Sequence, residues 1–199
     1  MWKLNFPDKK YQIIYADPPF NYNIERDKAV LMGSAKNHYD TMSLEDICNL
    51  PVQQIADKNC YLFLWCSSPT LQNALEVMQR WGFSYRTIAF VWSKTNREMG
   101  VGYYTRPNHE FVLLGRKGAL KIKSHKVKQW IKAPTTTHSK KPNEVRNRIL
   151  QLLGDLQRIE LFSRTKVHGW DVIGNDEKLE NIPLEAFSHQ LINKELLLD

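Results

Sequence analysis

The segment Tyr11-Gln-Ile-Ile-Tyr-Ala16, followed at once by Asp17-Pro-Pro-Phe20, is the part of this 199-residue sequence that decides how its fold is interpreted. The first six residues form a short apolar run, which is typical of a buried strand. The two prolines end that strand, because proline has no N–H group to donate to a strand ladder. The segment therefore predicts a carboxylate at the end of a buried strand.

Similar apolar runs alternate with helical patterns along the rest of the chain. Strands are predicted over 59–65, 84–92, 110–114 and 158–162. Helices are predicted from Ser68 to Gly82, from Pro142 to Gly154 and over 183–198, with a short one after the capping sequence Ser43-Leu-Glu-Asp46 and a long loop over 20–41. Strands separated by helices indicate an α/β fold with a mainly parallel, doubly wound sheet and helices on both faces.

Polar residues follow two of these predicted strands. Asp17 ends the first strand, and Ser163 and Arg164 end the strand over 158–162. Ligands of such sheets bind beyond the carboxyl ends of the strands. If the two strands are parallel neighbours, their polar ends share one edge of the sheet, and that edge is the predicted site.

Size and composition indicate one globular domain over residues 1–199. The longest apolar run, Cys60 to Cys66, is much shorter than the roughly 20 residues that span a bilayer. The first ten residues lack the apolar region of a secretory signal. No membrane association and a cytoplasmic location are therefore expected.

The three cysteines and most of the tryptophans are predicted to belong to the core. Cys48, Cys60 and Cys66 are odd in number and have no paired metal-ligand spacing, so reduced buried thiols are favoured over metal or redox chemistry. Core packing is also favoured for Trp65, Trp81, Trp92 and Trp170.

Positive charge is concentrated in one stretch of the chain. The formal net charge is +7, yet eleven Lys or Arg residues and only one acid lie between Arg116 and Arg148. Such a stretch indicates a surface facing a polyanion, and a solvated surface segment is the alternative. The residues predicted to bind nucleic acid are Lys121, Lys123, Lys126 and Lys128.

The residue types from Asp17 to Phe20 suit the amino group of a nucleobase. The carboxylate of Asp17 and the carbonyl of Pro18 could each accept one N–H bond, and the bond to Asp17 strengthens as positive charge develops on the nitrogen. Pro18 and Pro19 stiffen the turn. Phe20 offers a flat face for an extruded base. The alternative is an ordinary Asp-Pro turn with Phe20 in the core.

Two phosphate-binding signatures are missing from the sequence. It contains neither the GxGxxG dinucleotide fingerprint nor the GxxxxGK[ST] loop. S-adenosylmethionine carries no phosphate and needs no such cradle, whereas kinases and nucleoside triphosphatases are disfavoured.

From about residue 11 to residue 177, the chain resembles the MT-A70 family of S-adenosylmethionine-dependent adenine N6-methyltransferases, especially its compact bacterial and phage-like members. The resemblance rests on an ordered series of blocks: Asp17-Pro-Pro-Phe20, Leu62-Phe-Leu-Trp65, Trp81-Gly-Phe83, Trp92-Ser-Lys-Thr-Asn96, His138-Ser-Lys-Lys-Pro-Asn-Glu144, Ile159-Glu-Leu-Phe-Ser-Arg164 and Gly169-Trp-Asp-Val-Ile-Gly-Asn175. Phe20 departs from the family pattern, because most relatives carry Trp or Tyr there.

The resemblance implies a circularly permuted, Rossmann-like class I methyltransferase, in which the catalytic strand precedes the cofactor-binding strand. It implies S-adenosylmethionine as cofactor and no metal. The implied catalytic residues are Asp17, Pro18, Pro19 and Phe20. The implied cofactor-binding residues are Asp17, Lys141, Glu160, Arg164, Asn175 and Asp176, with an indirect role equally open for Glu160.

The function implied is methyl transfer to N6 of adenine in DNA. The alternatives are an RNA adenine N6-methyltransferase, a non-catalytic nucleic-acid-binding partner subunit on the same fold and, less favoured, a small-molecule methyltransferase. A homodimer or a heteromeric partner subunit is compatible with the family pattern, in which eukaryotic members act as pairs.

Overall fold

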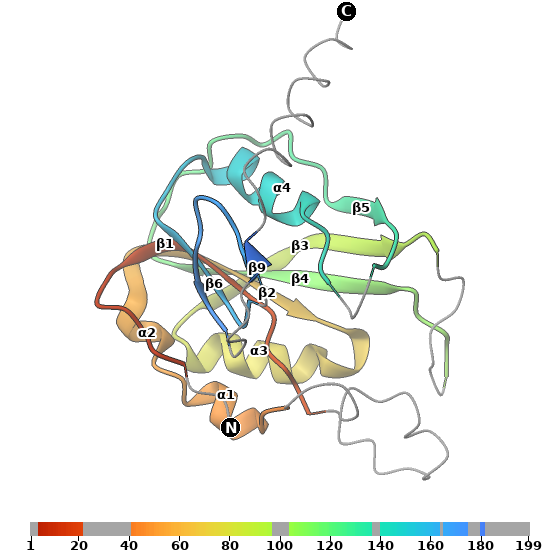
Figure 1. The fold of residues 1–199 in the computed structure, drawn as a ribbon, viewed down its shortest axis with the longest axis horizontal. Coiled ribbons are helices and arrows are strands. Elements are labelled where there is room, and N and C mark those ends of the chain that lie inside the picture. Colours follow the sequence, from red (N-terminus) through yellow and green to blue (C-terminus); the bar gives the residue numbers. More distant parts are fainter. Residues whose placement is uncertain are drawn as a thin grey trace, which may run out of the picture.

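The computed structural model describes residues 4–21, 41–96, 104–136, 140–163, 165–174 and 180–181. The strands of its main sheet are β1 (Tyr11–Ala16), β2 (Ala56–Cys66), β3 (Ser84–Lys94), β4 (His109–Lys117), β5 (Trp130–Ala133), β6 (Arg158–Leu161) and β8 (Asp171–Ile173). These seven strands lie in the order β5-β3-β4-β2-β1-β6-β8 (Figure 1). Two short strands, β7 (Thr165–Lys166) and β9 (Glu180–Asn181), pair with each other.

The sheet is mainly parallel. β1 lies at its centre and pairs in parallel with β2 on one side and β6 on the other, and β6 continues in parallel to β8. β4 runs antiparallel to both of its neighbours, β2 and β3. β3 pairs in parallel with β5. The prediction of a mainly parallel sheet is confirmed, and β4 is its antiparallel strand.

Helices cover both faces of the sheet, as predicted (Figure 1). The helices of one face are α1 (Leu44–Cys48), α2 (Val52–Ile55) and α3 (Leu71–Arg80). They bury Ile47, Val52 and Val77 against one apolar cluster of the sheet. On the opposite face, α4 (Glu144–Leu153) buries Val145 and Ile149 in a second cluster.

The ends of the helices follow local signals in the sequence. The side chain of Ser43 caps α1 by accepting the Asp46 N–H at 3.1 Å. The helix predicted from Ser68 begins as a single 3-10 turn, η3 (Ser68–Thr70), before α3. Gly82 follows α3 with φ +80°, a left-handed conformation that favours glycine.

Several predicted boundaries differ from the structure. β2, β3 and β4 all extend beyond their predicted ranges, and α2, β5, β7, β8 and β9 were not predicted. The helix predicted over 183–198 and nearly all of the loop predicted over 20–41 lie outside the described residues.

The cysteines and the four tryptophans lie where the sequence places them. Cys48, Cys60 and Cys66 are free and buried. Burial raises the pKa of the Cys60 and Cys66 thiols to about 12, so both thiols are protonated at neutral pH. The tryptophans predicted for the core are no more than 7% exposed. In the described part of the chain, no helix has the length and apolar character to cross a membrane.

Candidate active site

The carboxyl ends of β1 and β6 meet at one edge of the sheet, as the sequence predicts. Ala16 pairs with Leu161 in the parallel ladder, so Asp17 and Ser163 follow neighbouring strand ends. The Ser163 N–H donates to the Ile173 carbonyl at 3.0 Å, which brings the end of β8 to the same place. We call this part of the molecule the carboxyl edge.

Four linked charged side chains lie at the carboxyl edge, and we call them the charge network: Asp17, Lys141, Glu110 and Lys94. The ammonium of Lys141 lies 3.1 Å from an Asp17 carboxylate oxygen and 3.0 Å from a Glu110 oxygen. Glu110 in turn accepts from the ammonium of Lys94 at 2.5 Å. The two carboxylates and two ammonium groups alternate and balance in charge, and they come from the ends of β1, β3, β4 and the turn before α4.

The surroundings of Lys141 and Glu110 keep both side chains ionised. Burial disfavours the Lys141 ammonium, but the carboxylates of Asp17 and Glu110 outweigh it and hold the pKa of Lys141 above its usual value. Burial likewise opposes the charge of Glu110, and Lys141 and Lys94 together lower the pKa of that carboxyl. Lys141 is therefore a cation at every pH at which the protein would work.

Asp17 is the most exposed side chain of the charge network. Its side chain is 35% exposed, whereas Lys141 is 12% and Glu110 14% exposed. The turn after it is fixed by backbone bonds: the Phe20 N–H donates to the Pro18 carbonyl at 2.8 Å, and the Met42 N–H donates to the Pro19 carbonyl at 2.9 Å. A carbonyl oxygen has two lone pairs, so the Pro18 carbonyl can accept a second N–H besides that of Phe20.

Phe20 lies in the core in this structure. The residue is only 6% exposed and belongs to the apolar cluster under α1 and α3. Burial of this kind is the arrangement expected of a core aromatic rather than of an open stacking face. Stacking of a base on Phe20 stays a prediction that this structure does not display.

Glu160 is held by a buried arginine rather than left open toward a ligand. The guanidinium of Arg146 donates to both Glu160 carboxylate oxygens, at 2.7 and 2.6 Å. A third N–H of Arg146 donates to the Asn143 side chain at 2.8 Å, and the guanidinium lies 5.5 Å from the ring centre of Tyr15. Arg146 thus joins β1, β6 and the turn before α4, which favours the indirect role for Glu160.

Three of the predicted cofactor-binding residues, Arg164, Asn175 and Asp176, lie outside the described residues. Their described neighbours Ser163 and Gly174 are in direct contact. A Cβ built on Gly174 would lie 1.8 Å from the Ser163 carbonyl oxygen, so only glycine allows this approach. The described residues that precede Arg164 and Asn175 therefore lie next to each other at the carboxyl edge.

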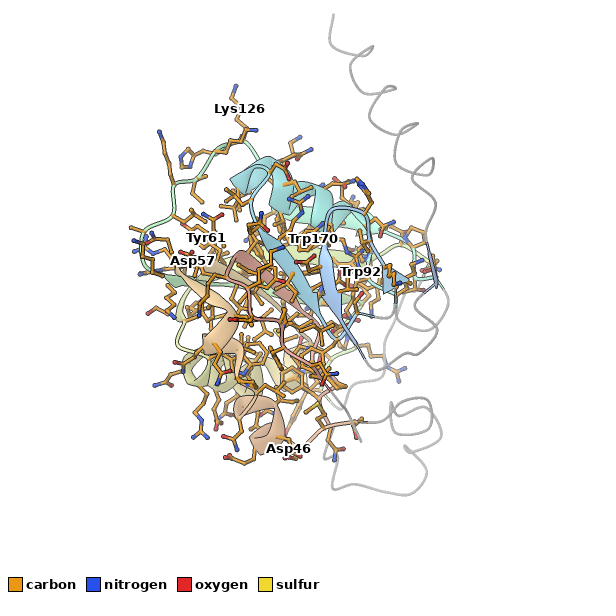
Figure 2. All side chains as sticks on the ribbon, turned by 60° about the vertical axis from the view of Figure 1, so that its left-hand side comes forward. Asp46, Asp57, Tyr61, Trp92, Lys126 and Trp170 are labelled. Carbon is orange, nitrogen blue, oxygen red and sulfur yellow. The ribbon has the colours of Figure 1, made fainter. Side chains whose placement is uncertain are left out.

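The lysines predicted to bind nucleic acid are exposed, but the structure does not bring them to Asp17. β4 runs away from the carboxyl edge, and its last residue pairs with Cys60 near the amino end of β2. The Lys123 N–H then donates to the Leu152 carbonyl at the far end of α4. Lys121 and Lys123 thus lie toward the amino ends of the strands, while Lys126 projects outward (Figure 2) and Lys128 precedes β5.

Three residues of the site are not among those predicted from the sequence. Lys94 lies within the quoted block Trp92-Ser-Lys-Thr-Asn96, so a signal for it was present. Glu110 and Arg146 carried no local signal. Their roles depend on the antiparallel course of β4 and on the packing of α4 over β6.

Comparisons with known proteins confirm the family resemblance predicted from the sequence. The family model described as MT-A70 matches residues 11–176. The Type II methyltransferase M.MunI of Mycoplasma sp is 35% identical over 199 residues, covering 90% of this chain and 84% of that protein.

Longer eukaryotic proteins also match. The N(6)-adenosine-methyltransferase catalytic subunit METTL3 of Homo sapiens is 25% identical over 175 residues, covering 83% of this chain and 28% of that protein. A putative N(6)-adenosine-methyltransferase MT-A70-like protein of Medicago truncatula is also 25% identical, with 83% of this chain and 26% of that protein covered. The chain spans about a quarter of these longer relatives. Because the MT-A70 family model matches most of the length of this chain, the chain belongs to the MT-A70 family.

Proposed function

We propose that this chain transfers a methyl group from S-adenosylmethionine to the N6 amino group of adenine in DNA. The observation that carries the proposal is the partly exposed Asp17 carboxylate at the end of β1, which lies 3.1 Å from the Lys141 ammonium. The membership of the protein in the MT-A70 family supports it. The compact M.MunI relative, of which this chain covers 84%, supports an enzyme of this size.

The Asp17 carboxylate has the chemistry that an adenine amino group requires. The lone pair of that nitrogen is delocalised into the ring, so the nitrogen is a weak nucleophile. N–H bonds donated to Asp17 and to the Pro18 carbonyl would orient the amino group. As the nitrogen becomes positive, its hydrogen bond to the Asp17 carboxylate becomes stronger than it is in the ground state. This preferential stabilisation of the transition state lowers the barrier to methyl transfer.

Lys141 and Glu110 keep this carboxylate in place. Lys141 neutralises part of the Asp17 charge without removing it, and Glu110 holds Lys141 from the other side. When bound, S-adenosylmethionine supplies an electrophilic methyl group on a sulfonium. We propose that Lys141, Arg164, Asn175 and Asp176 hold it and that Glu160 contributes through Arg146.

RNA is the alternative substrate, because the eukaryotic relatives are named N(6)-adenosine-methyltransferases. Labelled S-adenosylmethionine should be incubated with matched DNA and RNA oligonucleotides, each single- and double-stranded, and with free adenosine. Label in the DNA is the expected result. Label in RNA alone would reassign the substrate, and label in no oligonucleotide would favour a non-catalytic partner subunit or a small-molecule enzyme.

Lys141→Gln is expected to weaken S-adenosylmethionine binding about tenfold or more, since a charge-assisted hydrogen bond to the methionine carboxylate would be lost. Isothermal calorimetry measures this change. Lys140→Gln, an exposed neighbour, is the matched control and should bind normally. Unchanged affinity in Lys141→Gln would remove the cofactor role and leave Lys141 as the partner of Asp17 and Glu110.

Replacing Lys121, Lys123, Lys126 and Lys128 by alanine is expected to lower DNA affinity and to flatten its dependence on salt. Each lost phosphate contact reduces the slope of log affinity against log salt by about 0.9. Fluorescence anisotropy at several salt concentrations measures both changes. The pair K126A/K128A should account for more of the loss than K121A/K123A, which lies toward the amino ends of the strands. An unaltered slope would show that the stretch is only a solvated surface.

Three finer statements belong to the same proposal. The catalytic strand β1 precedes β6 in the chain, the order expected of a circularly permuted class I methyltransferase. A homodimer or a heteromeric partner subunit stays a prediction, and so does a cytoplasmic location.

A further inference from the structure

Trp130 is the exposed tryptophan of the described residues. It is 53% exposed, whereas Trp65, Trp81, Trp92 and Trp170 are between 0 and 7% exposed. An exposed tryptophan offers a large, rigid aromatic face on which a planar group can stack. Trp130 begins β5, which forms one edge of the sheet beside β3 (Figure 1).

The surroundings of Trp130 are positively charged. Lys128 and Lys132 lie two residues before and after it, and both are exposed. Ile131 between them is buried, so Trp130 and Lys132 lie on the outer side of the strand. No Asp or Glu occurs from Phe111 to Asn143. An exposed aromatic ring between lysines is the arrangement with which proteins bind a nucleic-acid strand.

The backbone that carries Trp130 is fixed. The guanidinium of Arg148 donates to the Lys128 carbonyl at 2.6 Å and to the Trp130 carbonyl at 2.8 Å. Trp130 pairs with Val91 in the ladder between β3 and β5. The ring is therefore presented by a pre-ordered strand rather than by a free loop, which reduces the entropy lost on binding.

β5 leads from Trp130 to the carboxyl edge. Its last residue, Ala133, pairs with Lys94, which binds Glu110 in the charge network. The Trp92 indole N–H donates to the Ala133 carbonyl at 2.9 Å and ties this end of β5 to the core. Trp130 thus lies three residues back along a strand whose last residue pairs with Lys94. Glu110 and Lys141 link Lys94 to Asp17.

We propose that Trp130 is a stacking platform for an unpaired base of the substrate strand, outside the base that receives the methyl group. Lys128 and Lys132 contact the phosphates on either side of that base. The inference rests on the proposed function, because it takes the substrate to be a nucleic acid. It adds a second contact, on β5, which holds the strand without reading its sequence.

The test is binding of a fluorescein-labelled oligothymidylate to the full chain, since this probe contains no adenine to be methylated. Trp130→Ala is expected to lower affinity about tenfold, within the range measured for loss of one stacked base. Trp130→Phe, which keeps an aromatic face, is expected to recover most of it. S-adenosylmethionine affinity should not change in either variant.

Tyr85→Ala is the matched control. Tyr85 is 47% exposed, close to the value of Trp130, but it lies on β3 near the amino end, where Ser84 pairs with Arg116. Loss of affinity in Trp130→Ala together with normal affinity in Tyr85→Ala supports the platform. Equal affinity of Trp130→Ala and the wild type, or an equal loss in both variants, overturns it.

Two further measurements separate this inference from its alternatives. If β5 instead pairs with a second copy of the chain, light scattering will show a dimer that Trp130→Ala dissociates, and this outcome overturns the platform. Methyl transfer by the wild type is measured in the same preparation. If the wild type transfers methyl groups but Trp130→Ala binds the oligonucleotide as tightly as the wild type, only the stacking platform is refuted. If the wild type transfers no methyl group to any oligonucleotide, the proposed function is refuted.

Discussion

Asp17→Asn is expected to slow methyl transfer to adenine about 10²- to 10³-fold, the range found when one preorganised group that stabilises a transition state is removed. The amide is almost the same size as the carboxylate, so the turn and the contact with Lys141 can persist. It carries no charge to balance the positive charge that develops on the amino nitrogen. The rate at saturating substrates, measured with radiolabelled S-adenosylmethionine, reports this loss.

The controls for Asp17→Asn separate chemistry from binding and folding. S-adenosylmethionine affinity should remain within a few-fold of the wild type if the loss is chemical. Asp8→Asn, which changes an exposed carboxylate before β1, should transfer methyl groups normally. Full activity in Asp17→Asn would refute the catalytic assignment.

Arg146→Met is expected to reduce the free energy of unfolding by about 3–5 kcal/mol, the usual cost of leaving one member of a buried ion pair without its partner. Both side chains of the pair are only 9% exposed. The Glu160 carboxylate would lose two charge-assisted bonds while remaining buried beside β1. Urea unfolding followed by circular dichroism measures the change.

The double variant R146M/E160Q tests whether the loss comes from the unpaired charge. Without either charge, most of the stability should return, so the two changes should be strongly non-additive. Arg80→Met is the matched control, because its pair with Glu45 is 48% and 67% exposed and should contribute at most about 1 kcal/mol. A loss in Arg146→Met no larger than that in Arg80→Met would contradict the structural role of the pair.

The central part of the fold could be predicted from local sequence. β1 was predicted with its observed bounds, because an apolar run followed by two prolines leaves little choice. The shared edge of β1 and β6 followed from the rule that parallel strands bring their carboxyl ends together. β5 and β8, at the two edges of the sheet, each bury only one residue, so no apolar run marks them in the sequence.

The candidate site was only partly predictable, because its geometry depends on distant contacts. Glu110 reaches Lys141 because β4 runs antiparallel between β2 and β3, and nothing near Glu110 in the sequence predicts that course. The charge count located a basic stretch but not its direction, and β4 carries Lys121 and Lys123 away from Asp17. Phe20 illustrates a further limit, since an aromatic residue after a strand fits a core and a stacking site equally well.

The position of the transferred methyl group tests the proposed function most sharply. The chain should be incubated with DNA and S-adenosylmethionine carrying a deuterated methyl group, and the DNA should be digested to nucleosides and examined by mass spectrometry. We expect the label on N6-methyldeoxyadenosine, formed by the wild type and nearly absent with Asp17→Asn. Label on cytosine or on a ring nitrogen of adenine, or equal labelling by Asp17→Asn, would contradict it.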